Sequence, residues 1–152
     1  MTSTQITATE LSPNLWIGNA NDLLIGDFIN TFDVIINCTK NIPFPEKSTC
    51  KTIRVFVDDN LDPVELDNLY KYLDKITQYI HAYLVNGRRV FVHCFAGKQR
   101  SASVIVAYYM RYFHMSLEEA TTALQSKRQI VFEPLCNFRP ILERFESRCS
   151  KK

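Results

Sequence analysis

The sequence lacks any apolar run long enough to cross a lipid bilayer, and its first ten residues lack the basic start and apolar stretch of a signal peptide. It also lacks internal repeats, low-complexity tracts and linkers. We therefore expect no membrane anchor and a cytoplasmic or nuclear protein that is not secreted. One domain is expected over residues 1–152, with polar, loose residues 1–10 and a core at about 11–148.

Strong charge of one sign is also missing. The chain has 18 basic and 16 acidic residues, which gives a formal net charge of +2. Such a mild balance favours neither a nucleic-acid partner nor an anionic membrane surface, so any affinity for an anion must be local. Hydrophobic residues make up 46% of the chain, which is enough for a real core. No pattern specifies an oligomeric state.

The sequence also shows no cysteine spacing typical of disulfides and no cluster of residues typical of metal ligands. The five cysteines are odd in number, and their spacing suits neither a disulfide framework nor a zinc site. No acidic cluster suggests a metal site, so we expect no metal and no cofactor. A reducing compartment is the expected environment.

What the sequence does contain is an alternation of apolar strands and helices. Runs rich in β-branched residues predict buried strands at residues 15–17, 33–37, 53–57 and 90–92. Helices are predicted from Pro63 to Gly87, at residues 101–113, from the capping box at Ser116, and at residues 134–148. This alternation predicts an α/β fold with a central, mainly parallel sheet that helices flank on both faces.

The informative segment lies between the strand at 90–92 and the helix at 101–113. It places Cys94 where a loop leaves the carboxyl edge of the sheet, the edge at which open α/β folds bind ligands. Backbone N–H groups of such a turn and the start of the next helix attract an anion. Arg100 would grip two oxygens of a phosphate. The expected phosphate-binding residues are Phe95, Ala96, Gly97, Lys98, Gln99 and Arg100.

A thiol in this loop would be unusually acidic. Helix N-termini and nearby cations lower the pKa of a cysteine from about 8.5 to about 3.5–7.5, and the thiolate is the nucleophile. We therefore expect Cys94 to attack phosphorus and form a phosphocysteine, which water hydrolyses. The alternative for Cys94 is a buried structural thiol.

His93-Cys94-x-x-Gly97-x-x-Arg100-Ser101 resembles the signature loop of the protein tyrosine phosphatase superfamily, and the following residues 102–110 are similar to its dual-specificity branch. The resemblance covers about residues 11–145. One departure is Leu135, which stands where the family has an asparagine after the proline corresponding to Pro134. We expect this departure to change the last loop locally without loss of activity.

The resemblance implies roles for further residues. A general acid is expected in the loop after the strand at 53–57, with Asp58 as the first candidate and Asp59 as the alternative. Ser101 would donate a hydrogen bond to the cysteine sulfur or act as a helix N-cap. His93 would orient the loop. Cys38 ends a neighbouring strand, and it is either a redox partner of Cys94 or merely a buried small residue.

The function that this resemblance implies is hydrolysis of phosphotyrosine, phosphoserine and phosphothreonine in proteins, with phosphorylated proteins as the partners. Other possibilities are a phosphoinositide phosphatase, since Gly97-Lys98 resembles that branch, and an RNA 5′-phosphatase. A non-catalytic phosphopeptide-binding module and a rhodanese-type sulfurtransferase are the alternatives outside this class. An aspartate over the cysteine loop would separate a phosphatase from the sulfurtransferase.

Overall fold

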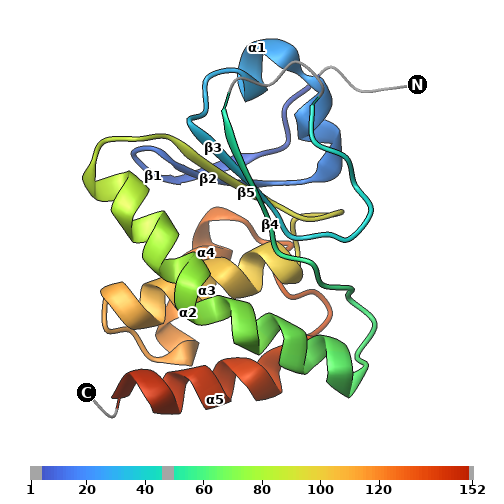
Figure 1. The fold of residues 1–152 in the computed structure, drawn as a ribbon. Coiled ribbons are helices and arrows are strands. Elements are labelled where there is room, and N and C mark those ends of the chain that lie inside the picture. Colours follow the sequence, from blue (N-terminus) through green and yellow to red (C-terminus); the bar gives the residue numbers. More distant parts are fainter. Residues whose placement is uncertain (1–4, 46–49, 151–152) are drawn as a thin grey trace.

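The structure, a computed structural model, describes residues 5–45 and 50–150 (Figure 1). Within these residues, five strands form one sheet in the order β1-β2-β5-β3-β4. Strands β2, β5, β3 and β4 run parallel to one another, and β1 pairs with β2 in the antiparallel sense. The predicted mainly parallel sheet is confirmed. The strands are β1 (Thr9–Ser12), β2 (Leu15–Gly18), β3 (Val34–Asn37), β4 (Lys51–Arg54) and β5 (Val90–His93).

Four longer helices follow or interrupt the strands in the described residues, and each starts where the sequence offers a suitable residue. Pro63 opens α2 behind Asp62, whose carboxylate accepts a hydrogen bond from the Val64 N–H at 2.9 Å. The predicted capping box of Ser116 and Glu119 opens α4. The helices are α2 (Pro63–Val85), α3 (Arg100–Tyr112), α4 (Leu117–Lys127) and α5 (Arg139–Ser150). None of the helices in the described part of the chain is long and apolar enough for a membrane crossing.

Helices cover both faces of the sheet, as predicted, but unequally (Figure 1). Helices α2 to α5 lie on one face, over alternate strand residues such as Ile36 and Val92. The 3-10 helix η1 (Ala20–Leu24) and the short α1 (Gly26–Ile29) cover the other face, where Phe28 packs against Ile35 and Phe91. Successive side chains of a strand point to opposite faces of the sheet, so one short apolar strand contributes to the core on both faces.

Three local predictions were wrong. Residues 9–10, expected to be loose, begin β1, whereas residues 1–4 and 151–152 lie outside the described residues. The strand expected at 53–57 is β4 at 51–54, because the chain leaves the sheet after Val55 and the Val57 carbonyl accepts a hydrogen bond from Arg100 instead. The last helix starts at Arg139 and not at residue 134, because the side chain of Gln99 binds the backbone of Leu135 and Asn137.

Candidate active site

Cys94 directly follows β5 at the carboxyl edge of the sheet and is only 2% exposed. The loop from Cys94 to Gln99 leads into α3. Gly97 in this loop has a φ of +67°, and a Cβ there would lie 2.6 Å from the Gly18 carbonyl oxygen and 2.7 Å from Nη2 of Arg128. Only glycine fits this position, both in backbone conformation and in space.

The carbonyl groups of this loop are bound by neighbouring elements. The Phe95 carbonyl accepts from the N–H of Ala20 at 3.1 Å, and the Lys98 carbonyl accepts from the N–H of Phe132 at 2.9 Å. Nε of Arg128 donates to the Gly97 carbonyl at 3.0 Å. Carbonyls that point outward leave backbone N–H groups to line the inside of the turn, which is the geometry of an anion-binding nest.

The surroundings of Cys94 favour the thiolate. Burial alone would raise the pKa of the thiol, but hydrogen bonds from the Ser101 side chain and from the backbone N–H groups of Ser101 and Lys98, together with the charge of Arg100, outweigh burial. The net result is a pKa of Cys94 below its ordinary value. The Cys94 sulfur lies 3.1 Å from Oγ of Ser101.

Arg100 links the cysteine loop to the segment that follows β4. One end of its guanidinium, Nη1, donates to the Val57 carbonyl at 2.9 Å. Its Nε is buried and has no partner in the structure. A buried N–H without a partner is costly unless a ligand satisfies it, and phosphate oxygens accept such bonds well. The geometry of Arg100 therefore suits an oxyanion held beside Cys94.

Ser101 and His93 flank the loop in the sequence and both contact Cys94. Ser101 is not the helix N-cap, because α3 begins at Arg100 and its N-cap is Gln99. His93 is fully buried, and Nδ1 of its ring lies 3.3 Å from the Cys94 carbonyl. Burial is the main cause that lowers the pKa of His93 to about 4, so the ring is neutral near pH 7.

Asp59, and not Asp58, lines the same pocket as Cys94. This pocket has a volume of about 360 Å³, and Lys98 and Arg100 line it too. Asp58 lines a neighbouring hollow of about 330 Å³, which Asp59 and Arg100 also line. The preference for Asp58 as the acid is therefore not supported by the geometry.

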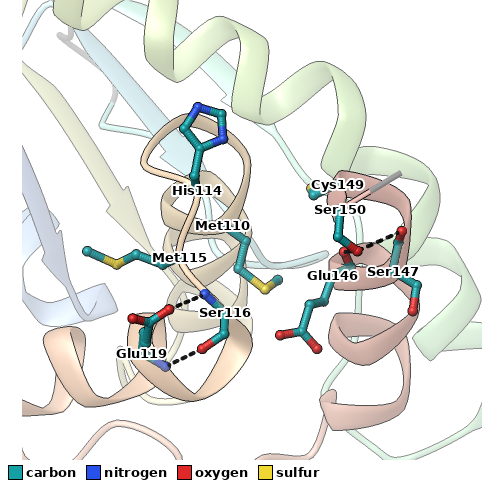
Figure 2. Close-up of a pocket in the computed structure, with 9 residues that line it drawn as sticks. All are labelled: Met110, His114, Met115, Ser116, Glu119, Glu146, Ser147, Cys149 and Ser150. Carbon is teal, nitrogen blue, oxygen red and sulfur yellow. Dashed lines mark hydrogen bonds between the residues drawn. The ribbon is translucent and has the colours of Figure 1, made fainter. Parts of the chain in front are cut away.

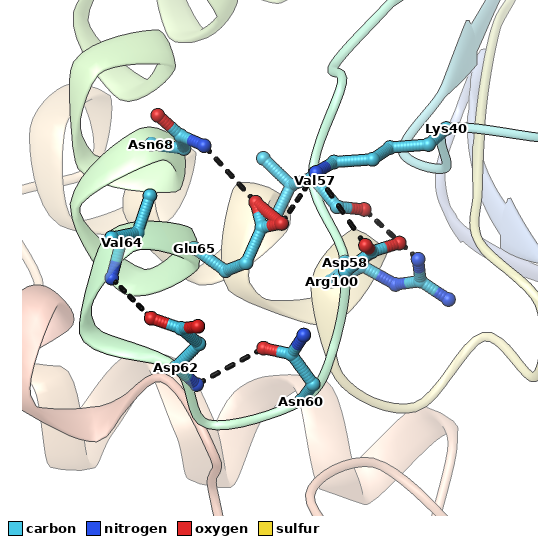
Figure 3. Close-up of polar contacts among 9 residues, drawn as sticks. All are labelled: Lys40, Val57, Asp58, Asn60, Asp62, Val64, Glu65, Asn68 and Arg100. Atoms are coloured by element: carbon cyan, nitrogen blue, oxygen red, sulfur yellow. Dashed lines mark hydrogen bonds and ion pairs between the residues drawn. The ribbon is translucent and has the colours of Figure 1, made fainter.

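The side chain of Asp58 contacts a lysine instead. Nζ of Lys40, in the loop after β3, lies 3.4 Å from Oδ2 of Asp58 and also contacts the carboxylate of Glu65 on α2 (Figure 3). Asn68 donates to the other oxygen of Glu65 at 3.0 Å. This network ties the segment after β4 to the loop after β3 and to the start of α2, and so fixes the backbone next to Asp59.

The sequence did not reveal three of the residues that build the site. Lys40 contacts Asp58, Arg128 binds the Gly97 carbonyl, and Asn137 donates to the carboxylate of Asp59. Arg128 lies within the part of the chain, about residues 11–145, that resembles the family, and that likeness was the available signal. No spacing pattern pointed to Lys40 or Asn137, because their partners are distant in the chain.

A separate pocket of about 390 Å³ lies between α3, α4 and α5 (Figure 2). Its carboxylates belong to Glu119 and Glu146, and both bind the start of α4: Glu119 accepts from the Ser116 N–H at 2.9 Å and Glu146 from the Leu117 N–H at 2.6 Å. Two carboxylates repel a phosphate group, so this pocket does not suit the anion that the Cys94 loop accommodates.

Comparison with known proteins identifies the family of this chain. The model for "Dual specificity phosphatase, catalytic domain" matches residues 15–148. This chain belongs to the dual-specificity phosphatase family. It is therefore an enzyme of the protein-tyrosine and dual-specificity phosphatase class, which the sequence predicted from the loop around Cys94.

Relatives of this dual-specificity phosphatase differ in length. It is 37% identical over 139 residues to "Putative tyrosine phosphatase 123R" of Invertebrate iridescent virus 6, covering 91% of each chain. It is 34% identical over 120 residues to the tyrosine-protein phosphatase MSG5 of Saccharomyces cerevisiae, covering 76% of this chain but only 23% of MSG5. The chain thus spans nearly the whole length of one relative and less than a quarter of the other.

Solved structures share the fold. A mouse "putative dual specificity phosphatase" solved with zinc tungstate has a TM-score of 0.85 at 26% identity, covering 97% of this chain and 91% of that chain. Human DUSP28 has a TM-score of 0.84 at 24% identity, covering 99% of both chains. A human tyrosine phosphatase-like serine/threonine/tyrosine-interacting protein has a TM-score of 0.79 at 24% identity, covering 93% of this chain and 96% of that chain.

Proposed function

We propose that this dual-specificity phosphatase hydrolyses phosphotyrosine, phosphoserine and phosphothreonine in proteins through a phosphocysteine intermediate. The Cys94 thiolate attacks phosphorus, the P–S bond forms, and the bond to the leaving oxygen breaks. Arg100 and the backbone N–H groups of the loop bind the equatorial oxygens, on which the transition state spreads its charge. The observation that carries the proposal is the buried Cys94 with its lowered pKa beside the unpartnered Nε of Arg100.

We assign the general acid to Asp59. It lines one pocket with Cys94 and Arg100, whereas the carboxylate of Asp58 binds Lys40. In the first step Asp59 gives its proton to the leaving oxygen, so that the product departs as a neutral hydroxyl. In the second step the Asp59 carboxylate takes a proton from water, which attacks phosphorus and releases the Cys94 thiolate and inorganic phosphate. A sulfurtransferase needs no such aspartate.

Ser101 and His93 act without exchanging protons with the substrate. Oγ of Ser101 lies 3.1 Å from the sulfur and donates to it, so it stabilises the thiolate both before attack and as leaving group in the second step. His93 holds the loop through the Cys94 carbonyl. Cys38 lies at the same edge of the sheet, fully buried, and takes no part in these steps.

The pocket residues favour phosphoproteins over phosphoinositides as substrates. Lys98 lines the pocket, as a basic residue does in the phosphoinositide phosphatases that the loop resembles. At the second position where that branch carries a basic residue, this chain has Phe95, which also lines the pocket and is 68% exposed. Relatives named dual specificity protein phosphatases support the breadth toward serine, threonine and tyrosine phosphates. The odd number of cysteines, whose spacing does not suit a disulfide framework, supports a reducing compartment, in the cytoplasm or nucleus.

The experiment is a substrate panel measured with EDTA present. Phosphotyrosyl, phosphoseryl and phosphothreonyl peptides, a phosphoinositide and a 5′-triphosphorylated RNA are compared on the wild type and Cys94→Ser. We expect turnover of the peptides by the wild type alone. Preference for the lipid or the RNA would reject the substrate class, and unchanged turnover by Cys94→Ser would reject the mechanism.

The same panel with esters of different leaving groups assigns the acid. Asp59→Asn should lose about 100-fold or more with phosphopeptides and much less with an ester whose leaving group departs as an anion. Asp58→Asn should keep the dependence on the leaving group that the wild type shows. The opposite result would make Asp58 the acid.

A further inference from the structure

The carboxylate of Asp59 has a partner outside its own loop. Nδ2 of Asn137 donates a hydrogen bond to Oδ1 of Asp59, over a distance of 2.9 Å. The two residues are 78 positions apart in the chain. Both line the pocket that contains Cys94 and Arg100. Asn137 therefore contacts the proposed acid from a distant segment of the chain that lines the same pocket.

The segment that carries Asn137 is itself fastened to the phosphate-binding loop. Oε1 of Gln99 accepts from the backbone N–H of Asn137 at 2.9 Å, and Nε2 of Gln99 donates to the Leu135 carbonyl at 2.8 Å. Gln99 is 6% exposed, and both bonds are partly buried. A side-chain amide that binds two backbone groups at once fixes their position firmly.

A continuous chain of hydrogen bonds thus joins the cysteine loop to the acid. It runs from Gln99, through the backbone of Leu135 and Asn137, to the side chain of Asn137 and on to Asp59. We propose that Asn137 is a positioning residue for Asp59, and that Gln99 sets the place of Asn137 relative to the bound phosphate. The proposal rests on the proposed function, with Asp59 as the acid.

The chemistry of the bond gives it a specific consequence. An amide N–H needs an acceptor, so Oδ1 is the oxygen that carries no proton when Asp59 is in its acid form. The proton then resides on Oδ2, which is left to donate to the leaving oxygen. In the second step the same bond holds the carboxylate while it accepts a proton from water. Asn137 thus fixes which oxygen of Asp59 reacts in both steps.

Leu135 fits this arrangement through its backbone. Its side chain is 69% exposed, and only its carbonyl takes part, as acceptor from Gln99. The polar side chain of the segment lies two residues further on, at Asn137. Leu135 replaces the asparagine that the family has at this position, but Asn137 still supplies a side-chain amide at the pocket.

The test uses the full chain and a series of aryl phosphates whose leaving groups differ in basicity. Asn137→Leu keeps the approximate size of the side chain but removes the donor. We expect turnover to fall about tenfold with the most basic leaving groups and to stay near wild type with the least basic. Thermal stability should change little, because the bond between Asn137 and Asp59 is exposed. Asn86→Ala, whose side chain binds the Ala82 carbonyl at the far end of α2, is the matched control.

A double-mutant cycle then separates positioning from a general structural role. In the Asp59→Asn background, Asn137→Leu should cause no further loss, because the group that it positions is gone. A loss of equal size in both backgrounds, a loss independent of the leaving group, or turnover of Asn137→Leu at or above wild type with basic leaving groups would each overturn the proposal. Failure of the proposed function would give a different result, because Cys94→Ser and Asp59→Asn would then turn over the substrates as fast as the wild type does.

Discussion

Cys38 and Cys94 occupy equivalent positions on neighbouring parallel strands. Each directly follows its strand, β3 or β5, and the last residues of those strands, Asn37 and His93, are register partners. The N–H of Cys38 donates to the His93 carbonyl at 2.8 Å. Neighbouring strands lie about 4.8 Å apart, and disulfides span Cα separations of about 4.4–6.8 Å. Both side chains pack in one buried cluster, so the spacing suits a disulfide.

We predict that Cys38 protects Cys94 from irreversible oxidation. Peroxide oxidises the Cys94 thiolate to a sulfenic acid; the Cys38 sulfur then attacks, water leaves, and a disulfide forms. Burial, and next the charge of Cys94, raise the pKa of Cys38, so its thiolate fraction and the protection should increase with pH. Wild type should regain activity on adding a reductant, and Cys38→Ser should not.

Peptide mapping by mass spectrometry checks this prediction directly. A linked Cys38–Cys94 peptide is expected from mildly oxidised wild type. Cys50→Ser, which changes a partly buried thiol on the other face of the sheet, serves as the control and should recover like wild type. Equal recovery of Cys38→Ser and wild type, with no linked peptide, would remove Cys38 from redox control.

The second prediction concerns the pH dependence of Cys94. Burial opposes the thiolate, yet the hydrogen bonds of Ser101 are the largest of the contributions that lower the pKa of Cys94. Alkylation by iodoacetate requires the thiolate, so its rate should fall as pH decreases through a midpoint below the pKa of an ordinary cysteine thiol. Ser101→Ala should move that midpoint upward. An unchanged midpoint would show that Ser101 does not stabilise the thiolate.

The third prediction is that Arg100→Lys is not conservative. Lysine retains the charge but cannot both donate to the Val57 carbonyl and bind two phosphate oxygens. We expect turnover to fall about 100-fold or more, the usual cost of losing a transition-state donor. Arg111→Lys, which alters an arginine on α3 that binds the Asp74 carbonyl, is the control and should leave turnover unchanged. Near wild-type turnover of Arg100→Lys would show that Arg100 does not clamp phosphate.

The fourth prediction compares two glycines. Gly97 and Gly87 have φ of +67° and +72°, but a Cβ at Gly87 meets nothing within 4 Å, whereas at Gly97 it would clash with Gly18 and Arg128. Gly87→Ala should cost only the backbone term of about 1–2 kcal/mol, or roughly 2–8 °C in Tm. Gly97→Ala should cost more and also abolish turnover. Equal loss of Tm in calorimetry would mean that the loop around Gly97 relaxes without strain.

The sequence predicted those helices and strands that are determined by a local pattern within one segment of the chain. The run before Cys94, the helix after Arg100 and the capping box at Ser116 are local patterns, and the structure bears each of them out. The helix predicted to begin at Pro63 is α2, and its start is borne out too. Its residues Leu69, Leu73, Ile76 and Ile80 are buried, and Leu66 and Tyr83 pack at its margin.

Contacts between distant segments could not be predicted in this way. Asp58 and Asp59 are adjacent and chemically identical, so their distant partners distinguish them. Asp58 contacts Lys40, 18 residues earlier in the chain, and Asp59 accepts a hydrogen bond from Asn137. The start of α5 was misplaced for the same reason, because Gln99 binds the backbone that local pattern assigned to a helix. Side chains that bind backbone across the fold leave no periodic signal in the sequence.

The covalent intermediate on Cys94 can be measured directly. Asp59→Asn enzyme is mixed with an aryl phosphate whose leaving group needs no proton, quenched in acid within the first turnover, and its Cys94 peptide analysed by mass spectrometry. Attack proceeds without the acid, but hydrolysis lacks its base, so the intermediate should accumulate. We predict one phosphoryl group on the Cys94 peptide of Asp59→Asn. The corresponding peptide of the Asp59→Asn/Cys94→Ser double variant should carry none. Phenol release in a burst without any phosphorylated Cys94 peptide, or an equal burst from the double variant, would contradict Cys94 as the nucleophile.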